Sequence, residues 1–409
     1  MIDRLHKFVA QVDPACRHAL SAYAVVRIYL LALAILVLAV YPGASDPRPE
    51  ARAAMGISPV EGPVRNALWG VWMRWDTLWY MRYARDGLLP TDHPEYRAFW
   101  PLYPWLMRWF APLFGGNYLL AGIVIANAAL IGALVLFYRL AAAETDEGTA
   151  RRGLWYLVLF PSAFFFFVAY SESLFLLLTM AAFYAARRKR WVWAAVWTAI
   201  SATVRVSGAF LLPALGIEYL RQRMEPEGWG VLRQVRWWVQ AALGAWPFAI
   251  AVAGVVFFPV YTMLFMGGGS LTTTLTFHTD TAVAGEGLVF PWGAIAQAVS
   301  ALLDGQFFVI QPFDLATTLL FLGLTVAAFL HLPLTYGVYM TVTMLALTIR
   351  SIPQQPLISA SRYVLTLFPA FFLLGRVGRR GWGNRLVLYP SLLLGGFFIA
   401  EFMIGGYVG

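Results

Sequence analysis

The sequence is poor in charged residues, cysteine and histidine. Only 12% of its 409 residues are Asp, Glu, Lys or Arg, whereas 60% are hydrophobic. Ordinary soluble domains carry about 25% charged residues, so this composition argues against one. The single cysteine, Cys16, cannot form an internal disulfide, and the five histidines provide no zinc-ligand spacing with it. The composition therefore predicts a polytopic membrane protein.

The positive charge of the chain is gathered in three short clusters between apolar runs. The net charge is +9 at pH 7. The clusters are RRKR at 187–190 and four arginines each within 221–236 and 376–385. Such clusters record the orientation of a membrane protein, so nucleic acid is not expected as a partner. We find no long soluble domain, short-period repeat or low-complexity tract, which predicts a single integral membrane domain over 1–409.

Long apolar runs predict the membrane-spanning helices. About 20 residues are needed to cross roughly 30 Å of hydrocarbon. The runs that fit this length are 22–41, which we interpret as a retained first span, 117–140, 238–265, 314–331, 333–349, 361–375 and 385–405. Two further regions, 154–186 and 191–220, are too long for one span and short for two. Polar residues interrupt both near the middle, around Glu172 and Arg205.

The positive-inside rule decides how these two regions cross the membrane. If both are hairpins, all three clusters lie on one side, which the rule makes cytoplasmic; if both are single spans, 187–190 lies outside. We therefore predict two hairpins and an all-α bundle of about eleven membrane-embedded helices, with the N-terminus inside and the C-terminus outside. In this topology 42–116 is the first extracytoplasmic loop and 267–312 is the second.

The stretch RWDTLWYMRYARDG at 74–87 is the most distinctive part of the first loop. Tryptophan, tyrosine and arginine settle where a bilayer meets water, so interfacial helices are expected there. Asp76 is the only acid in the tryptophan-rich part of the stretch. Its carboxylate either serves chemistry beside lipid headgroups or merely balances the neighbouring arginines.

The two hairpin tips place charges below the membrane surface. Limbs of about 13 to 16 residues rise roughly 20 to 24 Å, which is less than the apolar thickness. A charge at that depth is costly unless it faces a wet cavity or a partner. Glu172 and Arg205 therefore either pair with each other or line a cavity beneath Asp76. Arg362, which begins a later apolar run, is either part of a site or extends its guanidinium toward the interface.

Six stretches, taken in order, resemble the PIG-V family of GPI mannosyltransferase II and its prokaryotic relatives, within the GT-C class of polytopic glycosyltransferases. They are 74–87, AFWPLYPWL at 98–106, FPSAFFFFVAYSESLFLLL at 160–178, SATVRVSGAFLLPAL at 201–215, FPW at 290–292 and SRYVLTLFP at 361–369. The region 267–312 matches poorly outside FPW. The resemblance implies an enzyme that takes a sugar from a polyprenyl or dolichyl phosphate carrier on the non-cytosolic face and uses an aspartate of the first luminal loop.

By this resemblance the aspartate is Asp76, and Glu172, Arg205 and Arg362 fall in the other matched motifs. Glycosyl transfer needs a base for the acceptor hydroxyl and cations for the departing phosphate. Asp76 suits the base of a one-step, inverting transfer, whereas a two-step, retaining route would add Glu172 as the nucleophile. Arg205 and Arg362 suit the phosphate because a guanidinium keeps its charge and offers a fork of donors.

Further side chains are expected to bind substrate: Arg74, Trp75, Tyr80, His278 and Tyr363. His278 and Asp280 are the best candidates for a divalent ion, but two ligands in one flexible loop do not predict a metal site. We therefore expect no metal and no other cofactor.

The predicted function is transfer of a hexose, with mannose favoured, to a lipid-linked or glycan acceptor. The predicted partners are the lipid-linked donor, this acceptor and the membrane lipids. The location would be the cell membrane of a prokaryote or the endoplasmic reticulum of a eukaryote. Two alternatives are a transporter or flippase of lipid-linked sugars and a non-catalytic membrane subunit of a glycosylation complex. Broken helices at mid-membrane would favour transport, but the sequence shows no inverted repeat.

Overall fold

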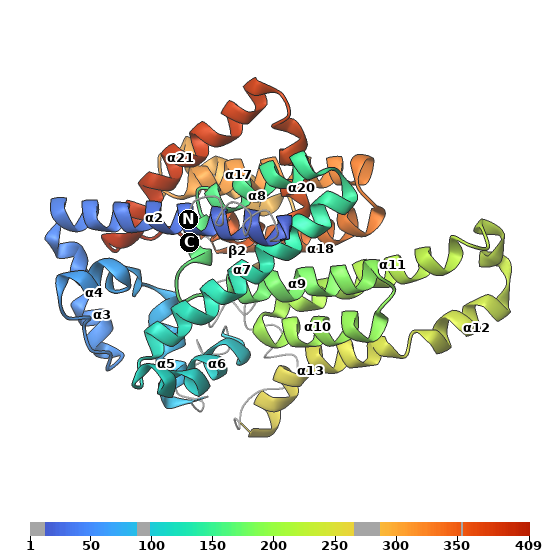
Figure 1. The fold of residues 1–409 in the computed structure, drawn as a ribbon, viewed down its shortest axis with the longest axis horizontal. Helices are drawn as coiled ribbons and strands as arrows, with labels where there is room; N and C mark the ends of the chain where they lie inside the picture. The colour runs from blue at the N-terminus through green and yellow to red at the C-terminus, as the bar shows by residue number, and fades with distance from the viewer. Residues whose placement is uncertain (1–12, 88–98, 266–286, 353–354) are drawn as a thin grey trace, which may run out of the picture. The chain divides into compact units, whose positions relative to one another are not determined.

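The computed structural model describes residues 13–87, 99–265, 287–352 and 355–409, and within them the chain is almost entirely helical (Figure 1). Among these residues, five helices are long and apolar enough to cross a membrane, or six if a broken pair counts as one span. The predicted all-α, polytopic membrane protein is confirmed. The count of about eleven membrane-embedded helices stays a prediction, because it includes helices of only 14 to 16 residues.

The chain forms two compact units, one from residues 1–78, 119–177 and 368–408 and the other from residues 79–118, 178–367 and 409. The first contains α2 (Pro14–Val40), η1 (Pro42–Ser45), α3 (Pro49–Ala54), α4 (Pro63–Leu68), η2 (Gly70–Trp72), α7 (Tyr118–Glu144), α8 (Glu147–Leu159), η5 (Ala163–Phe166), α20 (Phe368–Val377) and α21 (Gly381–Met403). Two helices, α5 (Asp76–Asp86) and α9 (Glu172–Arg187), begin in the first unit and continue into the second.

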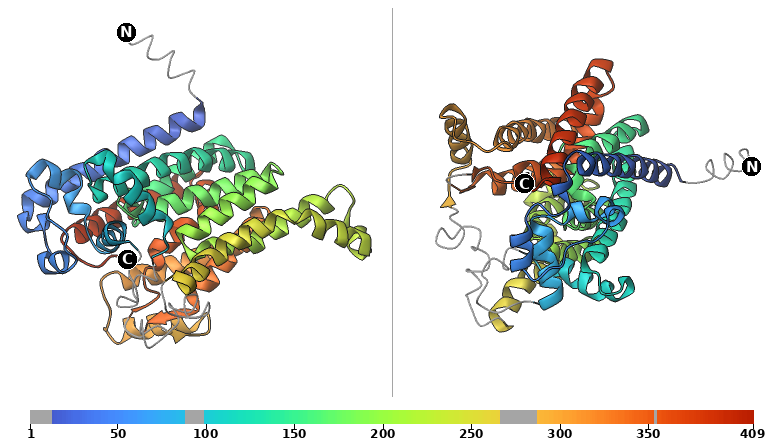
Figure 2. Two further views of the ribbon diagram at one scale, coloured as in Figure 1. Left: turned by 90° about the horizontal axis from the view of Figure 1, so that it is seen from below. Right: turned by 90° about the vertical axis from the view of Figure 1, so that its left-hand side faces the viewer.

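Helix α2 runs unbroken in both views of Figure 2 and buries a single stripe of mostly small side chains. The stripe consists of Ala15, Ala19, Ala22, Val26, Leu30 and Ala34. The spacing of three or four residues puts them on one face of the helix. Small side chains allow neighbouring helices to approach closely. The other faces expose large apolar side chains such as Ile28 and Leu36, as a helix surrounded by lipid does.

Helices α8 and α20 lie side by side in the first unit (Figure 1). Two glycines permit this contact. A Cβ on Gly153 would lie 2.5 Å from the Phe371 carbonyl oxygen, and a Cβ on Gly375 would lie 2.5 Å from the Thr149 carbonyl oxygen. Because the backbones touch at both glycines, larger side chains there would separate the helices.

Asp146 caps the N-terminus of α8. Its carboxylate accepts hydrogen bonds from the Thr149 N–H at 2.9 Å and the Thr149 hydroxyl at 2.6 Å, and it pairs with Arg379. The hydroxyl bond from Thr149 contributes most to holding the pKa of Asp146 well below its usual range. The ionised cap therefore ties the start of α8 to the segment between α20 and α21.

The second unit contains the remaining elements. They are α6 (Leu102–Phe110), η4 (Ala111–Phe114), α10 (Trp191–Val204), η6 (Val206–Phe210), α11 (Leu211–Met224), η7 (Trp229–Arg233), α12 (Val235–Gly244), α13 (Pro247–Phe265), β1 (Gly287–Leu288), α16 (Gly293–Leu303), α17 (Gln311–His331), α18 (Leu334–Thr348), β2 (Arg350–Ile352), β3 (Gln355–Pro356), α19 (Ala360–Tyr363) and η9 (Val364–Thr366). The first predicted loop, 42–116, thus contains several short helices.

The two regions that fitted no single span are interrupted where their polar residues stand. The first breaks between the end of α8 at Leu159 and the start of α9 at Glu172. The second breaks at Arg205, which follows α10 in an extended conformation. Gly208 then lies against Ala202, since a Cβ on Gly208 would be 2.4 Å from the Ala202 nitrogen. The chain therefore turns sharply between α10 and α11.

Glu218 is the centre of a buried polar network in the second unit. Its side chain is fully buried on α11 and accepts hydrogen bonds from Arg187 and Arg221, both at 2.9 Å, and from Thr335 at 2.6 Å. Gln222 donates a further bond at 2.6 Å. The network joins the end of α9 to α11 and α18, and it neutralises part of the charge of two predicted cytoplasmic clusters.

A small antiparallel sheet in the order β1-β2-β3 is an addition that the apolar pattern did not predict. Gly287 pairs with Ser351, and Ile352 pairs with Gln355. The sheet holds the segment before α16 against the segment before α19. Helices α16, α17 and α19, with the turn before α19, share an apolar core of Ala294, Ala298, Leu315, Leu357 and Ala360.

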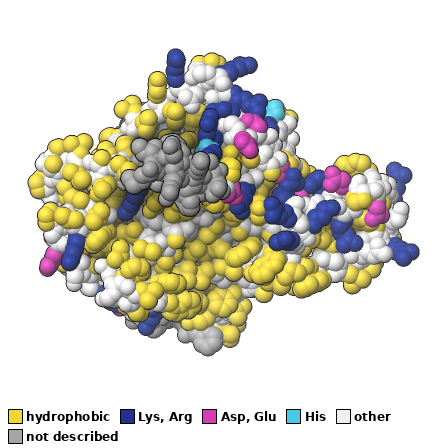
Figure 3. All heavy atoms as spheres, in the orientation of Figure 1, with side chains coloured by type: hydrophobic (Ala, Val, Ile, Leu, Met, Phe, Trp, Pro, Cys, Tyr) yellow, Lys and Arg dark blue, Asp and Glu magenta, His cyan; other side chains and the backbone are white. Residues whose placement is uncertain are grey.

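Two predicted spans, 238–265 and 361–375, are each divided in the structure. The first becomes α12 and α13, which are separated at Ala245 and Trp246, because the residue before a proline disfavours helix and Pro247 begins α13. The second breaks between η9 and α20 at Leu367. The turn that joins α11 to α12 extends beyond α10 in Figure 1 and in the left view of Figure 2. Dark-blue side chains gather there in Figure 3, where the arginines of 221–236 lie.

Candidate active site

Asp76 is the first residue of α5 and is half-buried. The turn before it is unusual, because Trp75 has a φ of 50°, a left-handed conformation that is strained for a bulky side chain. The Asp76 N–H donates to the Tyr170 hydroxyl at 3.2 Å. Asp76 is thus a half-buried carboxyl group whose backbone is fixed by Tyr170.

Tyr170 joins the Asp76 motif to the loop that precedes Glu172. This fully buried tyrosine also donates to the Arg74 carbonyl at 3.4 Å. Beside it, the Thr77 hydroxyl lies 3.5 Å from the Ala169 carbonyl oxygen. The structure therefore brings together two of the matched motifs, 74–87 and 160–178. The sequence places Tyr170 within a matched motif but gives no sign of this contact.

Glu172 begins α9, two residues after Tyr170, and is fully buried. The loop before it is fixed by the Ser173 hydroxyl, which donates to the Phe166 carbonyl at 2.6 Å. Glu172 and Asp76 are thus each the first residue of a helix, and the loop before Glu172 contacts the turn before Asp76. The deeper burial of Glu172 distinguishes it from Asp76.

Arg74 is buried and its guanidinium is used by backbone carbonyl groups. It donates to Ala44 at 2.6 Å, to Met73 at 2.9 Å, to Gly70 at 3.1 Å and to Met403 at 3.3 Å. Burial lowers the pKa of Arg74 to about 10, so the group stays charged at neutral pH. In this position Arg74 fixes the fold of the loop around Asp76.

Trp75 and Tyr80 lie in two different aromatic clusters. The indole N–H of Trp75 donates to the Gly406 carbonyl at 2.9 Å, and the ring meets Tyr407 edge to face. Tyr80 is buried, with its ring edge to face with Phe99 and Tyr103 at centroid distances of 5.0 and 4.9 Å. Trp75 is the more exposed of the two side chains.

Arg205, Arg362 and Tyr363 come together in the second unit. The Arg205 Cζ lies 5.1 Å from the centre of the Tyr363 ring, and the Arg362 Cζ lies 5.5 Å from it. Arg362 is buried and donates to the Gly409 carbonyl at 3.2 Å, whereas Arg205 is half-buried. Two guanidinium groups near one ring form a positive site with cation–π support, which suits an anionic group such as phosphate.

Asp314 supports this cluster and was not singled out from the sequence. Its buried carboxylate, in the first turn of α17, accepts the N–H of Ser361 at 2.8 Å. The turn before Ser361 is strained, with positive φ at Leu357 and Ser359. Asp314 therefore helps to hold the residues just before Arg362 in place. An acid in an otherwise apolar helix was the available signal.

His278 and Asp280 lie outside the described residues. Within the described ranges, no group of three His, Cys, Asp or Glu side chains is placed to hold a metal ion.

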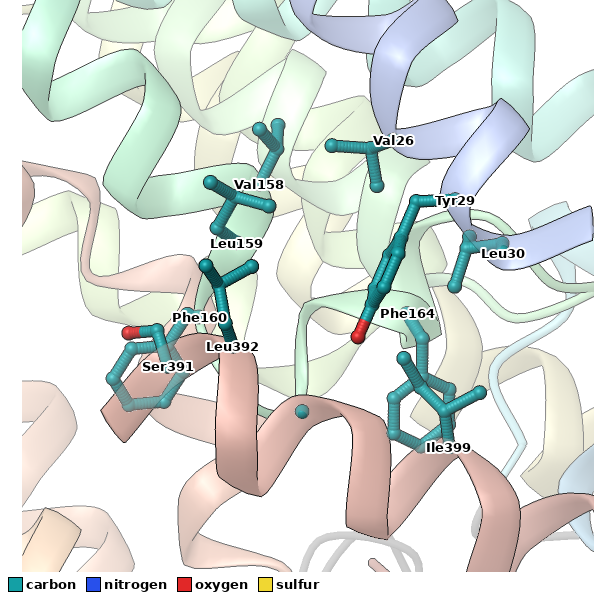
Figure 4. A pocket seen from close by; sticks show the side chains of 11 residues that line it. Val26, Tyr29, Leu30, Val158, Leu159, Phe160, Phe164, Ser391, Leu392 and Ile399 are labelled. Atoms are coloured by element: carbon teal, nitrogen blue, oxygen red, sulfur yellow. The ribbon is translucent and has the colours of Figure 1, made fainter. Parts of the chain in front are cut away.

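A small apolar cleft in the first unit lies between α2, α8 and α21 (Figure 4). Its walls are apolar apart from Tyr29 and Ser391. The Ser391 hydroxyl is bonded to the Val387 carbonyl at 2.6 Å. The cleft therefore offers apolar contact surface and little for chemistry.

Comparisons with known proteins identify the family. The family model described as mannosyltransferase (PIG-V) matches residues 17–224, just over half of the chain. No curated protein gave a significant match. Among solved structures, ArnT from Cupriavidus metallidurans bound to undecaprenyl phosphate aligns with a TM-score of 0.46 and 13% sequence identity, over 92% of this chain and 76% of that chain. The chain belongs to the mannosyltransferase (PIG-V) family and is a membrane glycosyltransferase.

Proposed function

We propose that the protein transfers mannose from a polyprenyl or dolichyl phosphate carrier to a lipid-linked or glycan acceptor on the non-cytosolic face of the membrane. The family supports the sugar, and the predicted topology supports the face. The observation that carries the chemistry is the position of Asp76 at the start of α5, where its N–H is bonded to Tyr170 of a second matched motif, 160–178.

In the proposed reaction Asp76 is the general base. Its carboxylate takes the proton of the acceptor hydroxyl, and the acceptor oxygen forms a bond to the anomeric carbon of the donor. The bond between that carbon and the phosphate oxygen breaks, and its electron pair stays on the phosphate. One carboxylate suffices for this single, inverting step. Glu172 is the candidate nucleophile if transfer instead retains configuration, and its full burial disfavours that role.

Arg205 and Arg362, which both lie near the Tyr363 ring, are proposed to contact the donor phosphate. Their guanidinium groups would stabilise the charge that grows on the phosphate as the sugar departs. Trp75 and Tyr80 remain candidate substrate contacts, as does His278. Arg74 is assigned a positioning role instead, because its guanidinium donates to four backbone carbonyl groups.

The test is transfer by purified protein given polyprenyl-phosphate mannose and a lipid extract, with products identified by mass spectrometry. Asp76→Asn is nearly isosteric, so we expect normal yield, normal donor binding and transfer at least about 100-fold slower. Asp86→Asn, at the other end of α5, is the matched control and should transfer normally. Near wild-type turnover by Asp76→Asn would remove Asp76 from the mechanism.

Arg205 is tested by donor affinity. Arg205→Ala removes the charge, and Arg205→Lys keeps the charge but loses the planar fork. We expect weaker donor binding in both variants, with Arg205→Lys less affected. If both bind donor like the wild type, Arg205 has a structural role only.

A further inference from the structure

Arg48 lies over the Trp75 ring, with its Cζ 4.1 Å from the ring centre. Trp75 directly precedes Asp76, so Arg48 packs on the side chain of the residue next to the proposed base. The stem of Arg48 passes close to Gly405, where a Cβ would lie 3.6 Å from the Arg48 Cγ. Arg48 is exposed, in contrast to the buried Arg74.

The surface beneath Arg48 is fixed. The Trp75 N–H donates to Gly406, the ring packs against Tyr407, and the backbone at Trp75 is held in a left-handed conformation. Strain of this kind persists only where the surroundings enforce it, and it is concentrated at functional sites. The indole is therefore a rigid support that sets where the guanidinium lies.

The N–H groups of the Arg48 guanidinium are available for a ligand. Over residues 13–87, 99–265, 287–352 and 355–409, its side chain forms no hydrogen bond or ion pair. Arg52, one turn further along α3, is instead bonded to Asp46 at 2.8 Å and to the Ile57 carbonyl. A guanidinium carries its N–H groups in one plane as a fork, so unbonded N–H groups can form a two-point contact with an anion.

We propose that Arg48 binds a phosphate carried by a lipid, beside Asp76. The phosphate is that of the sugar donor or that of an anionic phospholipid headgroup, and the assignment to the donor rests on the proposed function. As the sugar leaves, the donor phosphate gains negative charge, so the contact would strengthen during the reaction. The alternative is that Arg48 only packs on Trp75 through the cation–π contact and binds no phosphate.

The experiment measures lipid binding by the full chain in nanodiscs, with polyprenyl phosphate as the probe in neutral phospholipid. Charge-assisted hydrogen bonds of this kind contribute enough to change affinity on the order of 10- to 100-fold. We expect Arg48→Gln to weaken binding by about this factor and Arg48→Lys to recover part of it. Arg65→Gln removes an exposed arginine from nearby α4 and should bind like the wild type.

A second arm replaces the probe with phosphatidylglycerol in otherwise neutral nanodiscs and counts bound lipid by native mass spectrometry. Loss of polyprenyl phosphate binding in Arg48→Gln identifies the donor, and loss of phosphatidylglycerol alone identifies the headgroup. Wild-type binding in both arms by a folded Arg48→Gln protein would overturn the proposal. Neither arm needs turnover. If lipid binding depends on Arg48 but the protein shows no transferase activity, the proposed function is refuted and the lipid-phosphate site at Arg48 is retained.

Discussion

Replacing Arg74 should destabilise the loop that carries Asp76 and so lower the free energy of unfolding. The guanidinium donates to four carbonyl groups, those of Ala44, Gly70, Met73 and Met403. At about 1 kcal/mol for each acceptor, Arg74→Met should lower the free energy of unfolding by roughly 4 kcal/mol. For a chain of 409 residues, the usual unfolding entropy converts this loss to a fall of about 5 °C in melting temperature.

The assay is thermal unfolding of purified variants in detergent, followed by intrinsic tryptophan fluorescence. Arg74→Lys should recover part of the loss, because an ammonium group has three donors and no planar fork. Arg65→Gln, which removes an exposed arginine of the same loop, is the control and should melt like the wild type. If Arg74→Met melts at the wild-type temperature and loses donor binding instead, Arg74 contacts substrate and the positioning role is wrong.

Three more predictions follow from the fold. Asp146→Ala should lower the free energy of unfolding by about 1 kcal/mol through loss of a helix cap. The pKa of Asp146 is lower in the folded state than in the unfolded state, so the ionised cap stabilises the fold fully above the unfolded pKa. This stabilisation is lost as the pH falls through the folded-state pKa. In acid the wild type should therefore lose the same free energy of unfolding that Asp146→Ala already lacks. Glu218→Ala should lower the free energy of unfolding by about 1 to 3 kcal/mol, because the buried Thr335 and Gln222 donors and two half-buried arginines lose their acceptor, and chemical denaturation should show it; unchanged stability would contradict the network. In a Cys16→Ser background, an impermeant thiol reagent on intact cells should label cysteine placed at Thr274 but not at Lys189; labelling of both would refute the topology.

The sequence by itself determined the class of the protein and two of the places where its helices break. Low charge and long apolar runs are consequences of residence in lipid, so they are visible without a structure. The breaks before Glu172 and at Arg205 were predictable for the same reason, because polar residues interrupt apolar runs there. The ordered motifs resembled the PIG-V family, and the family comparison confirmed it.

Local pattern could not show which motif contacts which. The Asp76 N–H meets the Tyr170 hydroxyl 94 residues away, and Arg74 meets Met403 across 329 residues. The chemistry of arginine suggested substrate binding for Arg74, whereas its burial among carbonyl groups gives it a positioning role. The sequence did not mark Arg48 at all, since nothing near it resembles a site.

The division of 238–265 into α12 and α13 has a local cause in Pro247, which hydropathy alone overlooked. The meeting of Arg205 with Tyr363 has no local cause. An apolar helix can rotate its faces in lipid with little change in hydropathy, so the partner of each polar side chain is decided only when the helices pack.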